Sequence, residues 1–152
     1  MEKLMFGAGC FWGVEEKLKK INGVKKVTVG YSGGETNNPT YKDVCTGTTG
    51  HAEVALVEYD ESLVNTEALL ELFWSIHDPT TLNQQGPDIG SQYRSAIFYF
   101  NEKQKPVIEK SKKTQQNILK KEVVTQVLPA KPFWPAEEYH QCYLEKKNRG
   151  SK

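Results

Sequence analysis

Alternating apolar and polar residues predict several strands along the chain. The alternation in residues 24–31 and 51–60 is typical of half-buried strands. In the second segment, one face carries Glu53, Ala55, Val57 and Tyr59, and the opposite face carries Ala52, Val54 and Leu56. Shorter apolar runs predict further strands at residues 3–8, 93–100 and 123–130.

Helical spacing of apolar residues separates these strands. Residues 11–22 place Val14 and Leu18 four positions apart, and Gly23 follows as a stop signal. In residues 66–77 one stripe carries Leu69, Leu72, Phe73 and Ile76. Asp78-Pro79 then ends the helix, because the residue before a proline is pushed out of the helical region. A polar surface helix at 101–121 and a short last helix at 135–147 complete the set.

The order of these elements predicts an α+β fold. Strands and helices interleave without the regular rhythm of a doubly wound sheet, so we expect a mixed or antiparallel sheet flanked by helices. The 152 residues fit one domain spanning 1–152. The polar loops after Tyr31 and after His77 are long for connectors in so small a domain, and we expect them to build the functional site.

Composition and charge exclude several classes of protein. Apolar residues make up 38% and charged residues 26%, and the formal net charge of +1 indicates neither nucleic acid nor an anionic membrane as a partner. No apolar run is long enough to span a bilayer, and the first residues lack the pattern of a secretory signal. Three widely spaced cysteines, Cys10, Cys45 and Cys142, make a poor disulfide framework and favour a reducing, cytoplasmic location.

Cys10 lies where the first strand gives way to the first helix, in the stretch "FGAGCFWG". A helix N-terminus stabilises an anion, so we expect the thiolate to be favoured and the pKa to fall from ~8.5 to roughly 3.5–7.5. The small residues Gly7, Ala8, Gly9 and Gly13 leave the sulfur open to a substrate. A structural, buried cysteine is the alternative at this position.

Two other uses of this segment fit poorly. A glycine-rich phosphate loop would need glycine where Trp12 stands. The cysteines and histidines show no spacing typical of a zinc site. Phe11 and Trp12 point about 100° apart on a helix, so we expect one in the core and the other beside the sulfur.

Several motifs in the same order resemble the A-type peptide methionine sulfoxide reductases. They are "GCFWG", "GYSGG", "NPTYKDVCTGTTGHAEV", "HDPTT", "QGPDIGSQYRSAIF" and "PAEEYHQCYL", and they cover nearly the whole chain. The resemblance implies a two-layer α/β sandwich with a ferredoxin-like core. It also implies thiol-dependent reduction of methionine S-sulfoxide, free or in proteins, and so repair of oxidised proteins.

The resemblance also assigns roles to residues. Cys10 would be the nucleophile and Glu53 the acid beside the sulfoxide oxygen. Phe11 and Trp12 would line the pocket for the methyl group. Tyr41 and Tyr93 would hydrogen-bond the sulfoxide oxygen, and Asp88 would support the site. A carboxyl that gives a proton at neutral pH needs an apolar setting that raises its pKa, which the alternation around Glu53 favours.

Reduction leaves Cys10 as a sulfenic acid, which a second thiol converts to a disulfide. Relatives often carry the recycling cysteine in a glycine-rich tail, but this chain has none after Cys142. We therefore favour Cys142 over Cys45 or an external thiol, with nearby His140 assisting its ionisation. A thioredoxin-like dithiol would then reduce the disulfide. No flavin, haem or metal is needed, and we expect a monomer.

Two other functions remain as alternatives. A non-catalytic, redox-regulated module that binds oxidised methionine would keep the pocket of Phe11 and Trp12 without needing Glu53. A cysteine hydrolase would need a histidine such as His51 to face Cys10 as a base.

Overall fold

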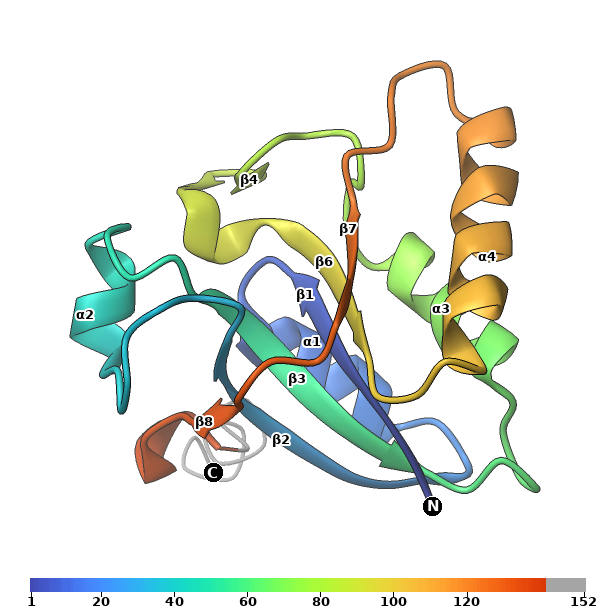
Figure 1. Ribbon diagram of the computed structural model, residues 1–152, viewed down its shortest axis with the longest axis horizontal. Coiled ribbons are helices and arrows are strands. Elements are labelled where there is room, and N and C mark those ends of the chain that lie inside the picture. The colour runs from blue at the N-terminus through green and yellow to red at the C-terminus, as the bar shows by residue number, and fades with distance from the viewer. Residues whose placement is uncertain (142–152) are drawn as a thin grey trace, which may run out of the picture.

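A six-stranded sheet forms the centre of the computed structural model, which describes residues 1–141 (Figure 1). Its strands lie in the order β7-β6-β1-β3-β2-β8. All neighbours are antiparallel except β6 and β7, which are parallel, so the sheet is mixed. The strands are β1 (Glu2–Ala8), β2 (Val24–Ser32), β3 (Ala52–Tyr59), β6 (Ser95–Tyr99), β7 (Gln126–Pro129) and β8 (Trp134–Pro135).

The N-terminal strand β1 occupies the middle of the sheet. Its Leu4 pairs with Val57 of β3 on one side and with Tyr99 of β6 on the other. The four strands β6-β1-β3-β2, with a helix after β1 and another after β3, make the βαββαβ arrangement of ferredoxin-like folds. The predicted α+β class is therefore confirmed.

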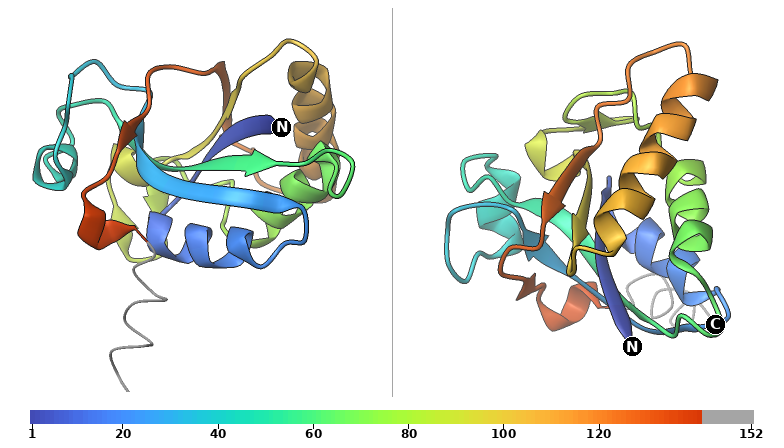
Figure 2. Two further views of the ribbon diagram at one scale, coloured as in Figure 1. Left: turned by 90° about the horizontal axis from the view of Figure 1, so that it is seen from below. Right: turned by 45° about the vertical axis from the view of Figure 1, so that its right-hand side comes forward.

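Helices α1 (Phe11–Lys19) and α3 (Thr66–Ser75) cover one face of this sheet (Figure 2). Helix α4 (Gln104–Ile118) packs beside α3, and the short helix α2 (Tyr41–Cys45) lies in the loop after β2, beyond the end of the sheet (Figure 1 and Figure 2). Figure 2 shows α1 and α3 on the same side of the sheet, with α4 beside α3. Phe6 of β1 stacks on Phe73 of α3 with ring centroids 5.1 Å apart, and the Trp74 indole of α3 donates to Ser111 Oγ of α4 at 2.8 Å.

The alternation predicted for β3 is what separates the two faces. Ala55, Val57 and Tyr59 belong to the large apolar cluster under the helices. Ala52, Val54 and Leu56 belong to a smaller cluster on the opposite face, where Phe133 and Ala130 of the returning chain pack. Glu53 shares the helix-covered face and is 1% exposed.

Several short elements lie where the sequence predicted only loops or a helix. The loop after β2 contains α2, whose N-terminus is closed by a capping box between Thr40 and Asp43. The loop after α3 contains a hairpin of β4 (Gln84–Gln85) and β5 (Asp88–Ile89), followed by the 3₁₀ turn η1 (Ser91–Tyr93).

The predicted last helix at 135–147 is wrong over its described part. This segment first adds β8 to the edge of β2 and then forms a single 3₁₀ turn, η2 (Glu138–His140). Gly30 permits this, because a Cβ there would collide with the Trp134 carbonyl and the Phe133 ring. Residues 142–147 of the predicted helix lie outside the described residues.

Candidate active site

Cys10 sits at the N-cap of α1, directly after β1. Gly9 has φ +91°, a conformation that favours glycine, and it turns the chain from the strand into the helix. The backbone N–H groups of Trp12 and Gly13 interact with the Cys10 sulfur, and the Phe11 N–H donates to Glu53 Oε1 at 3.2 Å. The free N–H groups of the first helical turn thus serve both the thiol and the carboxyl.

The predicted lowering of the Cys10 pKa is wrong for this structure. Burial raises the pKa to about 11, and the charges of Glu53 and Asp88 raise it further, against the opposing N–H groups of Trp12 and Gly13. The N–H groups of the helix terminus do lower the Cys10 pKa, as expected, but burial and the two carboxylates raise it by more. The resting thiol is therefore protonated at neutral pH.

Glu53 lies on β3, where it pairs with Tyr31 of β2. Burial raises its pKa from the ordinary 4.5 to about 7; the N–H of Phe11 opposes this rise and the charge of Asp88 adds to it. Its second oxygen, Oε2, is buried and has no hydrogen-bond partner within residues 1–141. A carboxyl with these properties can both hold and release a proton near neutral pH.

The two aromatic residues after Cys10 divide as their helical spacing predicts. Phe11 is 1% exposed and belongs to the core, whereas Trp12 is half-buried against it. Phe11 also contacts the ring of Tyr41, with centroids 6.5 Å apart. Trp12 and Phe11 thus make an apolar surface directly beside the thiol.

Three polar residues reach the same region from the two long loops. Tyr41 opens α2, Tyr93 ends η1 and Asp88 begins β5. Tyr41 hydrogen-bonds Tyr93 and the Cys45 thiol, and burial together with the charge of Glu53 raises the pKa of both tyrosines. The predicted residues Cys10, Phe11, Trp12, Tyr41, Glu53, Asp88 and Tyr93 therefore lie in one neighbourhood.

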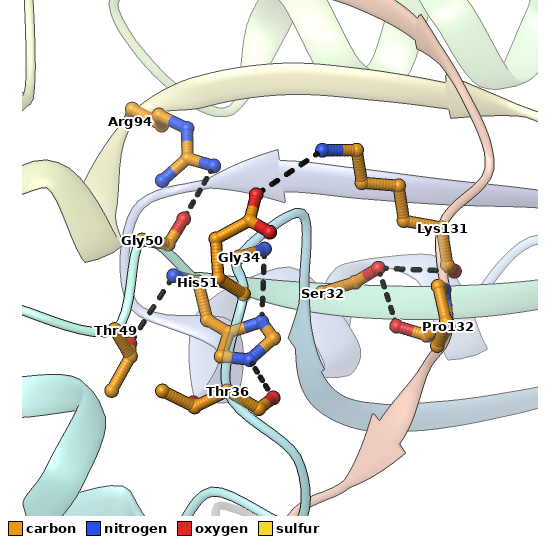
Figure 3. A network of polar contacts seen from close by, with 10 residues as sticks. Ser32, Gly34, Thr36, Thr49, Gly50, His51, Arg94, Lys131 and Pro132 are labelled. Carbon is orange, nitrogen blue, oxygen red and sulfur yellow. Dashed lines mark hydrogen bonds and ion pairs between the residues drawn. The ribbon is translucent and has the colours of Figure 1, made fainter.

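The loops that carry these residues are tied to the sheet by a polar network (Figure 3). Arg94 bonds the carbonyls of Gly50 and Ser91, both at 2.9 Å, and so joins the approach to Glu53 to the turn that carries Tyr93. His51 Nδ1 accepts from the Gly34 N–H at 3.0 Å, and its Nε2 bonds the Thr36 carbonyl at 2.7 Å. Both ring nitrogens of His51 are used by the loop, so it is not the base that a cysteine hydrolase would need.

The C-terminal segment contributes residues that the sequence did not point to. Glu137 accepts hydrogen bonds from the Tyr31 hydroxyl at 3.0 Å and from the Tyr41 N–H at 3.1 Å. The Gln141 side chain accepts from the Val29 N–H at 3.0 Å and donates to its carbonyl at 2.8 Å. His140, which we expected to assist the ionisation of Cys142, is 1% exposed and lies against Phe11 and Trp12. The one sequence signal for these residues is the motif "PAEEYHQ", because the segment has no regular spacing of apolar residues.

Cys142, the predicted recycling cysteine, lies outside the described residues. Cys10 and Cys45 are free thiols. Within residues 1–141, three or more side chains of histidine, cysteine, aspartate or glutamate nowhere gather as a metal site would require. The described helices also include none with the length and apolar character needed to cross a membrane.

Comparisons with known proteins agree with this geometry. A family model described as peptide methionine sulfoxide reductase matches residues 2–152. The chain is 55% identical to "Peptide methionine sulfoxide reductase MsrA" of Methanothermobacter thermautotrophicus over 97% of this chain and 89% of that protein. The chain belongs to the peptide methionine sulfoxide reductase family.

Solved reductase structures share the fold. Reduced Mxr1 of Saccharomyces cerevisiae superposes with a TM-score of 0.92 at 38% identity, covering 98% of this chain and 87% of that one. Mxr1 in complex with Trx2 superposes with a TM-score of 0.68 at 27% identity, covering 93% and 84%. This peptide methionine sulfoxide reductase is thus an oxidoreductase that reduces methionine sulfoxide with thiols, and membership of the family does not favour a module that only binds.

Proposed function

We propose that Cys10 is the nucleophile and Glu53 the proton donor of methionine sulfoxide reduction in this chain. The observation that carries the proposal is Glu53 Oε2, a buried carboxyl oxygen without a hydrogen-bond partner within residues 1–141. Oε1 is already engaged by the Phe11 N–H, next in sequence to the thiol. A sulfoxide oxygen that enters beside Cys10 would meet Oε2 as a hydrogen-bond partner.

The proton balance of the reaction needs no outside acid. The Cys10 thiol gives its proton to the Glu53 carboxylate, and the thiolate attacks the sulfoxide sulfur. Glu53 returns that proton to the sulfoxide oxygen. The oxygen ends on Cys10 as a sulfenic acid, and methionine leaves with its sulfur reduced by two electrons. Because the pKa of the thiol lies above that of the carboxyl, the resting site above neutral pH holds a thiol beside a carboxylate, and the reacting arrangement is the rarer of the two.

The surrounding residues fit the two ends of the sulfoxide group. Trp12, backed by Phe11, would hold the methyl group, which is worth roughly 0.8 kcal/mol of binding per buried carbon. Tyr41 and Tyr93, neutral because their pKa values are raised, would donate to the oxygen as it gains charge. Asp88 would act by keeping the Glu53 pKa high. Because the methyl group and the oxygen would each have a fixed place in the pocket, only one sulfoxide epimer fits, and we assign it as S.

Recycling of the sulfenic acid would use Cys142. Cys142 directly follows Gln141, and His140 contacts the rings of Phe11 and Trp12. Cys45 hydrogen-bonds Tyr41 and is the second candidate. A thioredoxin-like dithiol would then reduce the disulfide, as the complex of yeast Mxr1 with Trx2 suggests for that protein.

We further propose that residues 1–152 form one cytoplasmic domain that acts as a monomer on methionine sulfoxide, free or in proteins. One sheet takes strands from both ends of the described chain, which supports a single domain. Two free thiols beside the site support a reducing compartment. Sedimentation of the reduced protein tests the monomer, and a dimer at micromolar concentration would contradict it.

Single-turnover rates with a methionine sulfoxide peptide test the two catalytic roles. Cys10→Ser should abolish oxygen transfer, and Glu53→Gln should slow it by about 10²–10⁴-fold while binding changes little. Glu15→Gln is a matched control, because Glu15 is equally buried on α1 but pairs with Lys19. A Glu53→Gln rate equal to that of Glu15→Gln would overturn the role of Glu53.

Recycling is tested by one turnover without reductant, followed by peptide mapping under non-reducing conditions. A Cys10–Cys142 disulfide supports the proposal, and a Cys10–Cys45 disulfide transfers the role to Cys45. A persistent sulfenic acid that dimedone traps would show that an external thiol resolves it.

A further inference from the structure

The short helix α2 carries Tyr41 but has little packing of its own. Its five residues bury one apolar side chain, that of Val44, and helices this short depend on contacts from outside. Among the hydrogen bonds between described residues, one joins the backbone of α2 to a segment outside its own loop. In that bond the Tyr41 N–H donates to Glu137 Oε2 at 3.1 Å, across 96 positions of sequence.

Glu137 is also bonded to the central sheet. Its other oxygen, Oε1, accepts from the Tyr31 hydroxyl at 3.0 Å. Tyr31 is fully buried on β2, where it pairs with Glu53 of β3. The Glu137 carboxylate therefore bridges two parts of the site, the strands that hold the proposed proton donor and the helix that carries Tyr41.

The other contacts of Tyr41 do not fix how far its hydroxyl reaches into the site. Its ring lies against those of Phe11 and His140, with centroids 6.5 and 4.5 Å away, and apolar packing is not directional. Its bond to Cys45 stays within α2 and would move with the helix. Its bond to Tyr93 reaches another segment but ends on a second side chain of the same pocket.

A carboxylate suits this bridge, because both partners of Glu137 are donors and a carboxylate accepts on two oxygens. Burial opposes its ionisation, but the Tyr41 N–H and the Tyr31 hydroxyl act against burial, and the Glu137 pKa is lowered. The group is therefore an anion at neutral pH. Hydrogen bonds to an anion are shorter and stronger than those between neutral groups, so this bridge holds its partners closely.

We propose that Glu137 is a positioning residue that sets the place of the Tyr41 hydroxyl relative to Glu53. This rests on the proposed role of Tyr41 as a donor to the sulfoxide oxygen. Without the bridge α2 would shift, and a displacement of about 1 Å at a reacting group costs up to about 10²-fold in rate. Because Tyr41 acts on charge that develops during oxygen transfer, the loss should fall on the rate of that step and not on substrate binding.

Replacing Tyr93 makes the contribution of Tyr41 measurable. The two hydroxyls would donate to the same oxygen, so one can compensate for the other, and Tyr93→Phe also removes the bond between them. In the Tyr93→Phe background, Glu137→Leu should slow single-turnover oxygen transfer from a methionine sulfoxide peptide by about 10- to 100-fold. The peptide concentration that gives half the maximal rate should stay the same. Glu137→Gln should restore most of the rate, because its amide can accept from the Tyr41 N–H and donate to the Tyr31 oxygen.

Glu35→Gln is the matched control. Glu35 links the loop that contains α2 to Lys131 of the C-terminal segment at 3.9 Å, but its side chain is 89% exposed and such ion pairs contribute little. It should leave the rate of Tyr93→Phe unchanged. Amide exchange gives a second readout, in which the Tyr41 N–H should lose protection in Glu137→Leu and keep it in Glu35→Gln.

The double variant Tyr41→Phe/Tyr93→Phe separates the two proposals. If it transfers oxygen as fast as Tyr93→Phe, the proposed role of Tyr41 fails, and the inference about Glu137 fails with it. If it is slower but Glu137→Leu leaves the Tyr93→Phe rate unchanged, only the inference is overturned. Glu137→Leu should cost nothing further in the double variant, because the hydroxyl that it would displace is absent. An equal loss there would show that Glu137 supports the fold in general, and would also overturn the inference.

Discussion

At the scale of single residues, the site contains two ionisable groups whose pKa values are both raised. Burial and the charge of Asp88 raise the pKa of Cys10 and that of Glu53, and the charge of Glu53 raises the Cys10 pKa further. The reacting form has the proton on Glu53 and none on sulfur, so it carries one proton in total. The resting form between pH 7 and 11, a thiol beside a carboxylate, also carries one proton in total.

The pH dependence of a single turnover follows from this count. Below about pH 7 the site holds two protons, so the rate should rise with pH until Glu53 ionises and then stay level towards pH 11. In Glu53→Gln only the thiol titrates, and the slow residual rate should keep rising tenfold per pH unit above 7. Stopped-flow single turnovers from pH 5.5 to 9 test this. A parent rate that falls above pH 7 would show that the reacting form holds two protons.

The sequence predicted a raised pKa for Glu53, which the structure confirms, but it predicted the wrong direction for the pKa of Cys10. The position of Cys10 before a helix predicts a lowered pKa, and the alternation of β3 predicts a buried Glu53. The approach of Glu53 and Asp88 to the sulfur depends on β3 and on the β4–β5 hairpin, whose placement no local pattern encodes. The hydrogen bond between Trp12 and His140 was not predicted for the same reason, since the two residues lie 128 positions apart.

At the scale of elements, two glutamine side chains each bond a backbone N–H and a backbone carbonyl of another segment. Gln141 bonds both the N–H and the carbonyl of Val29 on β2. Gln116 likewise accepts from the Val123 N–H at 2.7 Å and donates to the Lys121 carbonyl at 3.0 Å. The first holds the C-terminal segment against the site, and the second holds the connection from α4 to β7.

Removing one of these side chains should free one segment only. In Gln141→Ala the Val29 amide should exchange with deuterium roughly 10- to 100-fold faster, because it loses its acceptor and a clamp on the segment. Gln116→Ala should instead release the Val123 amide and leave Val29 protected. Amide exchange followed by NMR measures both. Equal protection of Val29 in the parent and in Gln141→Ala would show that β8 alone holds the segment.

Element prediction succeeded where one face of an element is apolar. It placed α3 with Leu69 and Phe73 buried but missed Trp74, which is buried because α4 packs on a second side. It also missed α2, a five-residue helix stabilised by its capping box and by Glu137 from the distant C-terminal segment. Elements this short depend on tertiary contacts, which periodicity does not report.

At the scale of the whole molecule, the raised pKa of Glu53 links stability to pH. A folded pKa above the unfolded one means that the folded state holds a proton that the unfolded state has released. The free energy of unfolding should therefore fall as pH rises from about 4.5 to about 7. The full difference between these pKa values corresponds to about 3 kcal/mol.

Urea unfolding at pH 4.5 and pH 8 measures this contribution. Glu53→Gln should lose less stability than the parent between these pH values, by up to about 3 kcal/mol, because its amide does not titrate. Identical pH dependence in Glu53→Gln and the parent would mean that Glu53 ionises without cost in the folded state.

The central position of β1 has a consequence for the order of synthesis. β1 leaves the ribosome first, but its two neighbours, β3 and β6, are complete only at Tyr59 and Tyr99. At about 5–20 residues per second, Cys10 waits roughly 5–20 s for the second of them. Until then neither burial nor the nearby carboxyls hold its sulfur in the unreactive thiol form. The newborn chain is thus more open to oxidants at Cys10 than the folded protein is.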